Sequence, residues 1–183
     1  MNKSLILIGI AAVTLIVGLG IQSIDLQPSL RQDLHEPIPV PYVNLTRYLG
    51  AWYEQSTIPF YFEKGCSHTV ANYSMNSDGK SVKVFNSCIK NGRLTNSTGK
   101  AIPEDDTGAK LKVEFVQTLD IGGQYWVVRL GTNYDYVVVS NPTYRNLWIL
   151  YREPKMPESL YQFIYNDLKK DNYPVEKLVR TEQ

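Results

Sequence analysis

The two cysteines are the side chains of this sequence with the clearest capacity for covalent chemistry. Cys66 and Cys88 stand almost symmetrically on either side of the turn-forming stretch Asn76-Ser77-Asp78-Gly79, so we expect them at the same end of one β-hairpin. An exported location would permit a disulfide between them, and closing a loop of this size stabilises a fold by about 2–4 kcal/mol. The alternative is one reactive thiol, and a second cysteine placed to pair with it favours the disulfide.

Other residues that could carry chemistry are sparse. His35 and His68 lie in different segments, and Glu104-Asp105-Asp106 lies in a turn-rich stretch typical of a solvated loop. The motifs of nucleophile elbows, phosphate-binding loops, dinucleotide folds and zinc-binding helices do not occur in the sequence. Its 19 basic and 18 acidic residues are interspersed, whereas a nucleic-acid partner requires a basic stripe. We therefore expect no catalytic residue, no metal or other cofactor and no nucleic-acid partner.

The first part of the chain carries an export signal. Lys3 precedes an apolar run from Leu5 to Ile21 without a charged residue, which predicts a signal peptide or membrane anchor over residues 1–24. We favour an uncleaved anchor, with the rest of the chain extracytoplasmic; cleavage would make the protein secreted. Residues 25–43 contain four prolines among scattered charges and are predicted to form a linker.

The remaining part, residues 44–183, reads as a single all-β domain. Six runs rich in β-branched and aromatic residues are separated by hairpin turns such as Asn91-Gly92 and Gly122-Gly123, and stretches near Tyr53 and Lys100 raise the number of strands to about eight. The six runs are 70–75, 81–88, 111–118, 125–130, 136–140 and 147–152. Consecutive hairpins form an antiparallel up-and-down meander, which closes into an eight-stranded β-barrel wide enough for one small ligand.

One helix is expected near the end of the chain. Apolar residues follow Pro157 at helical spacing, which predicts a C-terminal α-helix packed outside the barrel. Its predicted apolar stripe is Leu160, Phe163, Ile164 and Leu168. A short final strand is expected from Val175 to Val179.

Several motifs resemble those of the lipocalin family. Gly50-Ala51-Trp52-Tyr53 is similar to the Gly-x-Trp-Tyr motif that opens the lipocalin fold. The other matching segments, in order, are 72–74, 109–115, 125–127 and 147–152. The resemblance covers residues 44–181 and extends to bacterial outer-membrane lipocalins, plant temperature-induced lipocalins and apolipoprotein D. Only Asp135-Tyr136 matches the middle motif, and the lipid-attachment cysteine of bacterial relatives is missing.

The resemblance implies roles for two residues at the closed end of the barrel. Trp52 would plug that end, and Arg152 would lie over its ring in a cation–π contact worth roughly 0.5–2 kcal/mol. Both residues are expected to be structural.

The predicted cavity follows from strand alternation, which sends every second side chain inward. If Lys83, Lys110 and Lys112 face solvent, then Val82 and Leu111 point into the barrel, and so do Val84, Val113 and Phe115. The other cavity residues are inferred from the resemblance. The predicted ligand-binding residues are Tyr73, Val84, Asn86, Val113, Phe115, Tyr125, Trp148 and Leu150. They form an apolar, aromatic chamber with a few hydrogen-bonding groups.

These features predict a protein that binds, stores or transports a small hydrophobic ligand, such as a fatty acid or lysophospholipid, at a membrane. The resemblance implies a role in membrane maintenance or stress, and a monomer or weak homodimer is expected. Two alternatives stay open. One is a lipid isomerase or peroxide scavenger that uses a cavity thiol, Cys66 or Cys88. The other is a lipocalin whose loops bind a protein partner.

Three sequons predict N-glycosylation if the chain passes through a eukaryotic secretory pathway. They begin at Asn44, Asn72 and Asn96. Asn72 is the best candidate, because the strand phase turns it outward.

Overall fold

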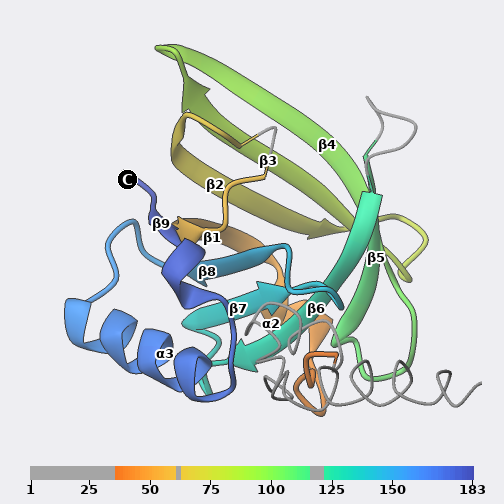
Figure 1. The fold of residues 1–183 in the computed structure, drawn as a ribbon. Helices are drawn as coiled ribbons and strands as arrows, with labels where there is room; N and C mark the ends of the chain where they lie inside the picture. The colour runs from red at the N-terminus through yellow and green to blue at the C-terminus, as the bar shows by residue number, and fades with distance from the viewer. Residues whose placement is uncertain (1–35, 61–62, 116–121) are drawn as a thin grey trace, which may run out of the picture. The chain divides into compact units, whose positions relative to one another are not determined.

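A closed antiparallel sheet dominates the computed structural model, which describes residues 36–60, 63–115 and 122–183 (Figure 1). Its strands are β1 Gly50–Thr57, β2 Cys66–Met75, β3 Val82–Lys90, β4 Arg93–Pro103, β5 Lys110–Phe115, β6 Gly122–Leu130, β7 Tyr136–Ser140, β8 Leu147–Tyr151 and β9 Val179–Arg180. Strands β2 to β8 pair in chain order, and β1 pairs with both β8 and β2. This closure confirms the predicted eight-stranded barrel. β9 is an addition that pairs with the far end of β1.

The burial pattern follows from which faces are covered. In β3, Val82 and Val84 are buried and Lys83 is exposed, as expected where one face meets solvent. In β7, Val137, Val138 and Val139 are all fully buried, because a helix covers the outer face. The simple alternation of period two is therefore lost at this side of the barrel.

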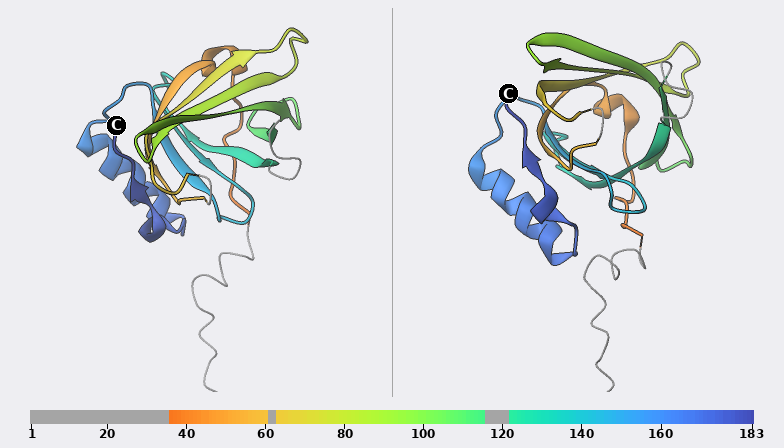
Figure 2. Two further views of the ribbon diagram at one scale, coloured as in Figure 1. Left: turned by 90° about the horizontal axis from the view of Figure 1, so that it is seen from above. Right: turned by 45° about the horizontal axis from the view of Figure 1, so that its top comes forward.

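That helix is α3, Glu158–Lys170, which lies against the outside of the barrel (Figure 2). Its buried face is formed by Tyr161, Ile164 and Leu168, and Tyr161 donates a hydrogen bond to Ser56 at 3.2 Å. The predicted stripe was wrong in including Phe163, which is 63% exposed. The spacing of Tyr161, Ile164 and Leu168 turns Phe163 away from the sheet.

Three further predictions need correction. Residues Val175–Lys177 form a 3-10 helix, η1, so the final strand is only Val179–Arg180. Gly122 and Gly123 belong to β6 and not to a turn. The end of the predicted linker is not free either, because Val40 and Val43 donate backbone hydrogen bonds to Val127 and Thr107, each at 2.8 Å.

The predicted signal or anchor over residues 1–24 lies outside the described residues. Among residues 36–60, 63–115 and 122–183, no helix combines the length and the apolar character needed to cross a membrane.

Candidate functional site

The barrel encloses a cavity of about 470 Å³. All eight residues predicted to bind a ligand line its wall: Tyr73, Val84, Asn86, Val113, Phe115, Tyr125, Trp148 and Leu150. The structure thus brings together side chains from strands β2, β3, β5, β6 and β8. Their contact with a ligand remains a prediction.

A bulge in β1 decides which polar groups face this cavity. The pairing of β1 with β8 skips Gln55, so Glu54 lies opposite Leu150 and Ser56 opposite Ile149. Glu54 lines the cavity, whereas Ser56 meets α3 outside. The extra residue is held by its side chain, since Gln55 Oε1 accepts a hydrogen bond from the backbone of Met156 at 3.0 Å.

The closed end of the barrel is built around Trp52 and Arg152. Trp52 is fully buried, and its indole donates to the Tyr48 carbonyl at 2.9 Å. The Arg152 guanidinium lies 3.7 Å from the centroid of the Trp52 ring and donates to four backbone carbonyl oxygens. Gly50 has φ of +95°, and a Cβ there would meet Arg152 Nη1 at 3.3 Å. The glycine of the Gly-x-Trp motif therefore makes room for the arginine.

Three tyrosine hydroxyls form a chain in the wall near this end. Tyr125 is hydrogen-bonded to Tyr48 at 2.6 Å and to Tyr73 at 3.2 Å. Tyr48 ends the short helix α2, Leu45–Tyr48, which is capped by Asn44. Burial raises the pKa of all three tyrosines well above 10, so these phenols stay neutral and act as hydrogen-bonding groups.

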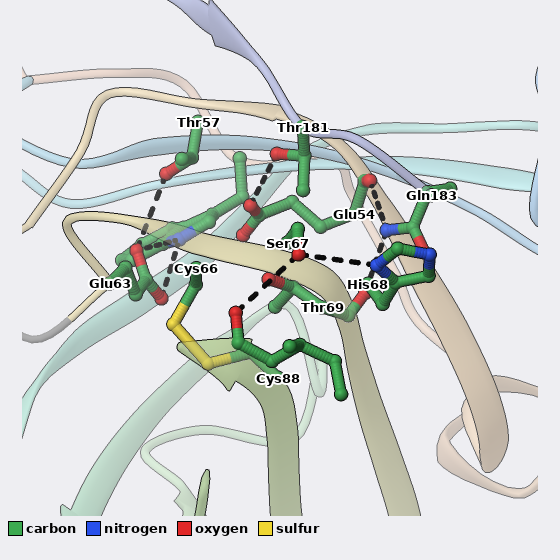
Figure 3. Close-up of a disulfide and its surroundings, with 12 residues drawn as sticks. Glu54, Thr57, Glu63, Cys66, Ser67, His68, Thr69, Cys88, Thr181 and Gln183 are labelled. Carbon is green, nitrogen blue, oxygen red and sulfur yellow. Dashed lines mark hydrogen bonds between the residues drawn. A yellow bond between two sulfur atoms is a disulfide. The ribbon is translucent and has the colours of Figure 1, made fainter. Parts of the chain in front are cut away.

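Two carboxyl groups lie in the wall nearer the open end (Figure 3). Glu54, only 4% exposed, accepts a hydrogen bond from Thr181. Glu63 accepts from the Trp148 indole at 3.1 Å and from Thr57 at 3.4 Å. Burial, with the neighbouring Glu63, raises the pKa of Glu54 to about 8. Burial also raises the pKa of Glu63.

The C-terminal residues fill the seam between β1 and β2, which is the gap beyond the last residues at which these two strands pair with each other. The backbone of Thr181 donates to Gln55 at 3.0 Å, and that of His68 donates to Glu182 at 2.6 Å. Gln183 reaches the carbonyls of Glu54 and Thr69 at 2.6 and 2.9 Å. This strip of chain covers the wall in which Glu54 is buried.

A disulfide joins Cys66 and Cys88 across β2 and β3, with Cα atoms 5.6 Å apart. The predicted pairing is confirmed. Both residues line the cavity, and in this oxidised state neither sulfur is a thiolate nucleophile. The cavity-thiol hypothesis therefore has no nucleophile here, and the bond is typical of extracytoplasmic proteins.

Sequence reasoning missed Glu54, Glu63 and Tyr48. A signal existed for Glu54, because it stands two residues after the inward Trp52 on one strand. No such pattern marks Glu63, which lies in the turn before β2. Tyr48 belongs to a single-turn helix whose approach to the cavity depends on the fold.

The predicted glycosylation sites differ in their surroundings. Asn72 and Asn96 are exposed on β2 and β4, whereas Asn44 is half-buried as the cap of α2. Within the described ranges, no group of three or more His, Cys, Asp and Glu residues is placed to hold a metal ion.

A closed barrel of eight antiparallel strands, plugged at one end and holding an apolar cavity, defines the class of lipocalin-like binding proteins. The family model described as "Lipocalin-like domain" matches residues 43–183. Temperature-induced lipocalin-1 of Arabidopsis thaliana is 33% identical, covering 77% of this chain and 80% of that protein. Apolipoprotein D of Bos taurus is 35% identical, with 81% of each chain covered. The outer membrane lipoprotein Blc of Vibrio cholerae is 31% identical, covering 79% of this chain and 85% of that protein.

Solved structures agree on the fold. Insecticyanin from the tobacco hornworm Manduca sexta superposes with a TM-score of 0.63 at 20% identity, covering 81% of this chain and 84% of that chain. Lobster apocrustacyanin A1 superposes with a TM-score of 0.62 at 16% identity, covering 76% of this chain and 79% of that chain.

The family model and the curated relatives show that the chain belongs to the lipocalin family, whose members generally bind small hydrophobic ligands.

Proposed function

We propose that this lipocalin binds, stores or carries a single-chain amphipathic lipid at a membrane, with a fatty acid and a lysophospholipid as the two candidate classes. The observation that carries the proposal is the 470 Å³ cavity, whose surface is mostly apolar with polar groups at a few points. Such a site buries an acyl chain and orients a polar head. The predicted anchor or signal over residues 1–24 and the disulfide support a site of action outside the cytoplasm, and a role in membrane maintenance or stress goes with it.

The test is native mass spectrometry of the protein, expressed in an oxidising compartment and mixed with fatty acids, lysophospholipids and sterols. We expect one lipid per chain, and weaker binding after Trp148→Ala, because Trp148 lines the cavity. Phe163→Ala is the matched control, since Phe163 lies exposed on the outside of α3. A folded protein that takes up none of these lipids would refute the proposal and favour a protein partner at the loops.

A further inference from the structure

We propose that the wall near the cavity mouth binds a head group that carries an ammonium with N–H donors, so that the preferred ligand is an alkylammonium amphiphile and not a fatty acid. The groups concerned are Glu54, Glu63, Thr69 and Asn86, all in the cavity wall. The inference rests on the proposed function, the binding of a single-chain amphiphile, and specifies the chemistry of its head group.

The first argument is charge. Glu54 and Glu63 bring two carboxyl groups into one wall, and among the described residues neither forms an ion pair with a basic side chain. Lys90 is the one basic residue that the described part of the wall contains. The raised pKa of both carboxyls reflects burial without a compensating cation. A bound ammonium would supply that cation.

The second argument is hydrogen bonding. Asn86 Oδ1 and Thr69 Oγ1 are buried in the same wall without a hydrogen-bond partner among the described residues. The carboxyl group of Glu54, 4% exposed, accepts one hydrogen bond among the described residues, from the Thr181 hydroxyl. An unpaired buried acceptor is destabilising, so the Asn86 amide oxygen and the second Glu54 oxygen are sites where a ligand N–H could donate.

A primary ammonium carries three N–H donors and no acceptor. It therefore matches both the charge and the unpaired acceptors. An ionised fatty acid offers only acceptors, so it supplies neither the positive charge nor the N–H donors. Below the head group, Val84, Val113 and Leu150 supply an apolar wall for a hydrocarbon chain.

The experiment compares four ligands with the same twelve-carbon chain by isothermal titration calorimetry at pH 7, using the full chain with its disulfide intact. They are dodecylamine, dodecyltrimethylammonium, dodecanol and dodecanoate. We expect dodecylamine to bind about tenfold more tightly than dodecanol, because charge-assisted hydrogen bonds are the stronger ones. Dodecyltrimethylammonium, which has charge but no N–H, should fall between them, and dodecanoate should bind most weakly.

The variants are Glu54→Gln, Glu63→Gln and the pair combined, with Glu176→Gln, at an exposed position of η1, as the control. Glutamine keeps the shape of each side chain, so dodecanol binding reports whether the cavity is intact. In the double variant the preference for dodecylamine over dodecanol should disappear, while the Kd of dodecanol changes by less than about threefold. The control should keep the preference.

The outcomes separate this inference from the proposed function. If dodecanoate or dodecanol binds as tightly as dodecylamine, or if the double variant keeps the preference, the head-group assignment is overturned and the lipid-binding function stands. If dodecyltrimethylammonium equals dodecylamine, the requirement for N–H donors is overturned. If none of the four ligands binds to the folded protein, the head-group assignment is overturned, and the mass spectrometry with fatty acids and lysophospholipids decides the proposed function separately.

Discussion

At the closed end of the barrel, Arg152 donates hydrogen bonds to four backbone carbonyls and stacks on the Trp52 ring. Near the open end, the buried carboxyls of Glu54 and Glu63 receive hydrogen bonds from hydroxyls, an indole and the Phe60 backbone, but not from a basic side chain among the described residues. The Asn86 amide oxygen receives none from the described residues. Polar groups that the chain itself satisfies hold the fold together. Polar groups that it leaves unsatisfied cost stability and are available to a ligand.

The largest effect should come from the closed end. Arg152→Ala removes the cation–π contact and four hydrogen bonds to backbone carbonyls, so we expect the free energy of unfolding in urea to fall by about 3–5 kcal/mol. Arg152→Lys keeps the charge but not the planar fork and should recover only part of the loss. Arg145→Ala, at an exposed loop position, is the control. A loss below about 1 kcal/mol would mean that the plug is not structural.

The next effect concerns the disulfide that holds β2 to β3. Replacing Cys66 and Cys88 together by serine should lower the free energy of unfolding by about 2–4 kcal/mol, because the open-chain unfolded state gains entropy. Reduction of the native protein should give a similar loss in urea denaturation. The loss should add to that of Arg152→Ala, since the sites lie at opposite ends of the barrel; strong non-additivity would contradict the division into two independent ends.

A third prediction uses the pH dependence of the open end. Glu54 has a pKa of about 8 in the folded protein against an ordinary value of 4.5, so between these values the folded state binds more protons than the unfolded state. The free energy of unfolding should therefore fall as pH rises from about 4.5 to 8. The change should amount to a few kcal/mol, because each pKa unit corresponds to about 1.4 kcal/mol and Glu54 and Glu63 titrate as a coupled pair.

The matched variant is Glu54→Gln, which has no carboxyl to ionise. Its unfolding free energy, measured by urea titration at several pH values, should lose most of this slope. If the pH slope of the unfolding free energy is unchanged in this variant, other groups cause the pH dependence. The contrast between the two ends of the barrel would then be wrong.

The smallest expected effect is a gain in stability. Asn86→Leu removes an unpaired buried amide oxygen and should raise the free energy of unfolding of the ligand-free protein by about 1 kcal/mol. Asn72→Leu, on an exposed position of β2, should have an effect within about 0.5 kcal/mol. If Asn86→Leu destabilises the protein instead, the amide has a structural partner and the open end is more nearly satisfied than the comparison states.

Much of the barrel was predictable because its strands obey a local rule. Turn residues such as Asn91 and Gly92, both with positive φ, separate alternating strands, and the alternation placed Val84 and Val113 on the cavity side correctly. Predictions failed where a helix covers the outside of the sheet, and where the chain lacks the regular alternation of a strand. Phe163 was assigned to the buried face of α3, and Val175–Lys177 was expected as a strand.

The cavity was less completely predictable than the barrel that contains it. The wall residues on regular strands followed from alternation and from the family motifs. Glu63 lies in an irregular segment, and the seam filled by Thr181–Gln183 depends on contacts between distant parts of the chain. No local pattern encodes such contacts.

By itself the sequence determined the number and order of the strands, the pairing of Cys66 with Cys88, and an apolar interior, because turn chemistry and side-chain alternation act over a few neighbouring residues. Only the tertiary structure decided that Glu54 is buried beneath the C-terminal residues, that Glu63 joins it in the wall, and that Tyr48 completes a chain of hydroxyls. These features depend on barrel closure and on the bulge at Gln55. Closure brings together residues more than one hundred positions apart, and the electrostatic environment of a carboxyl is set by those neighbours and not by the strand that carries it.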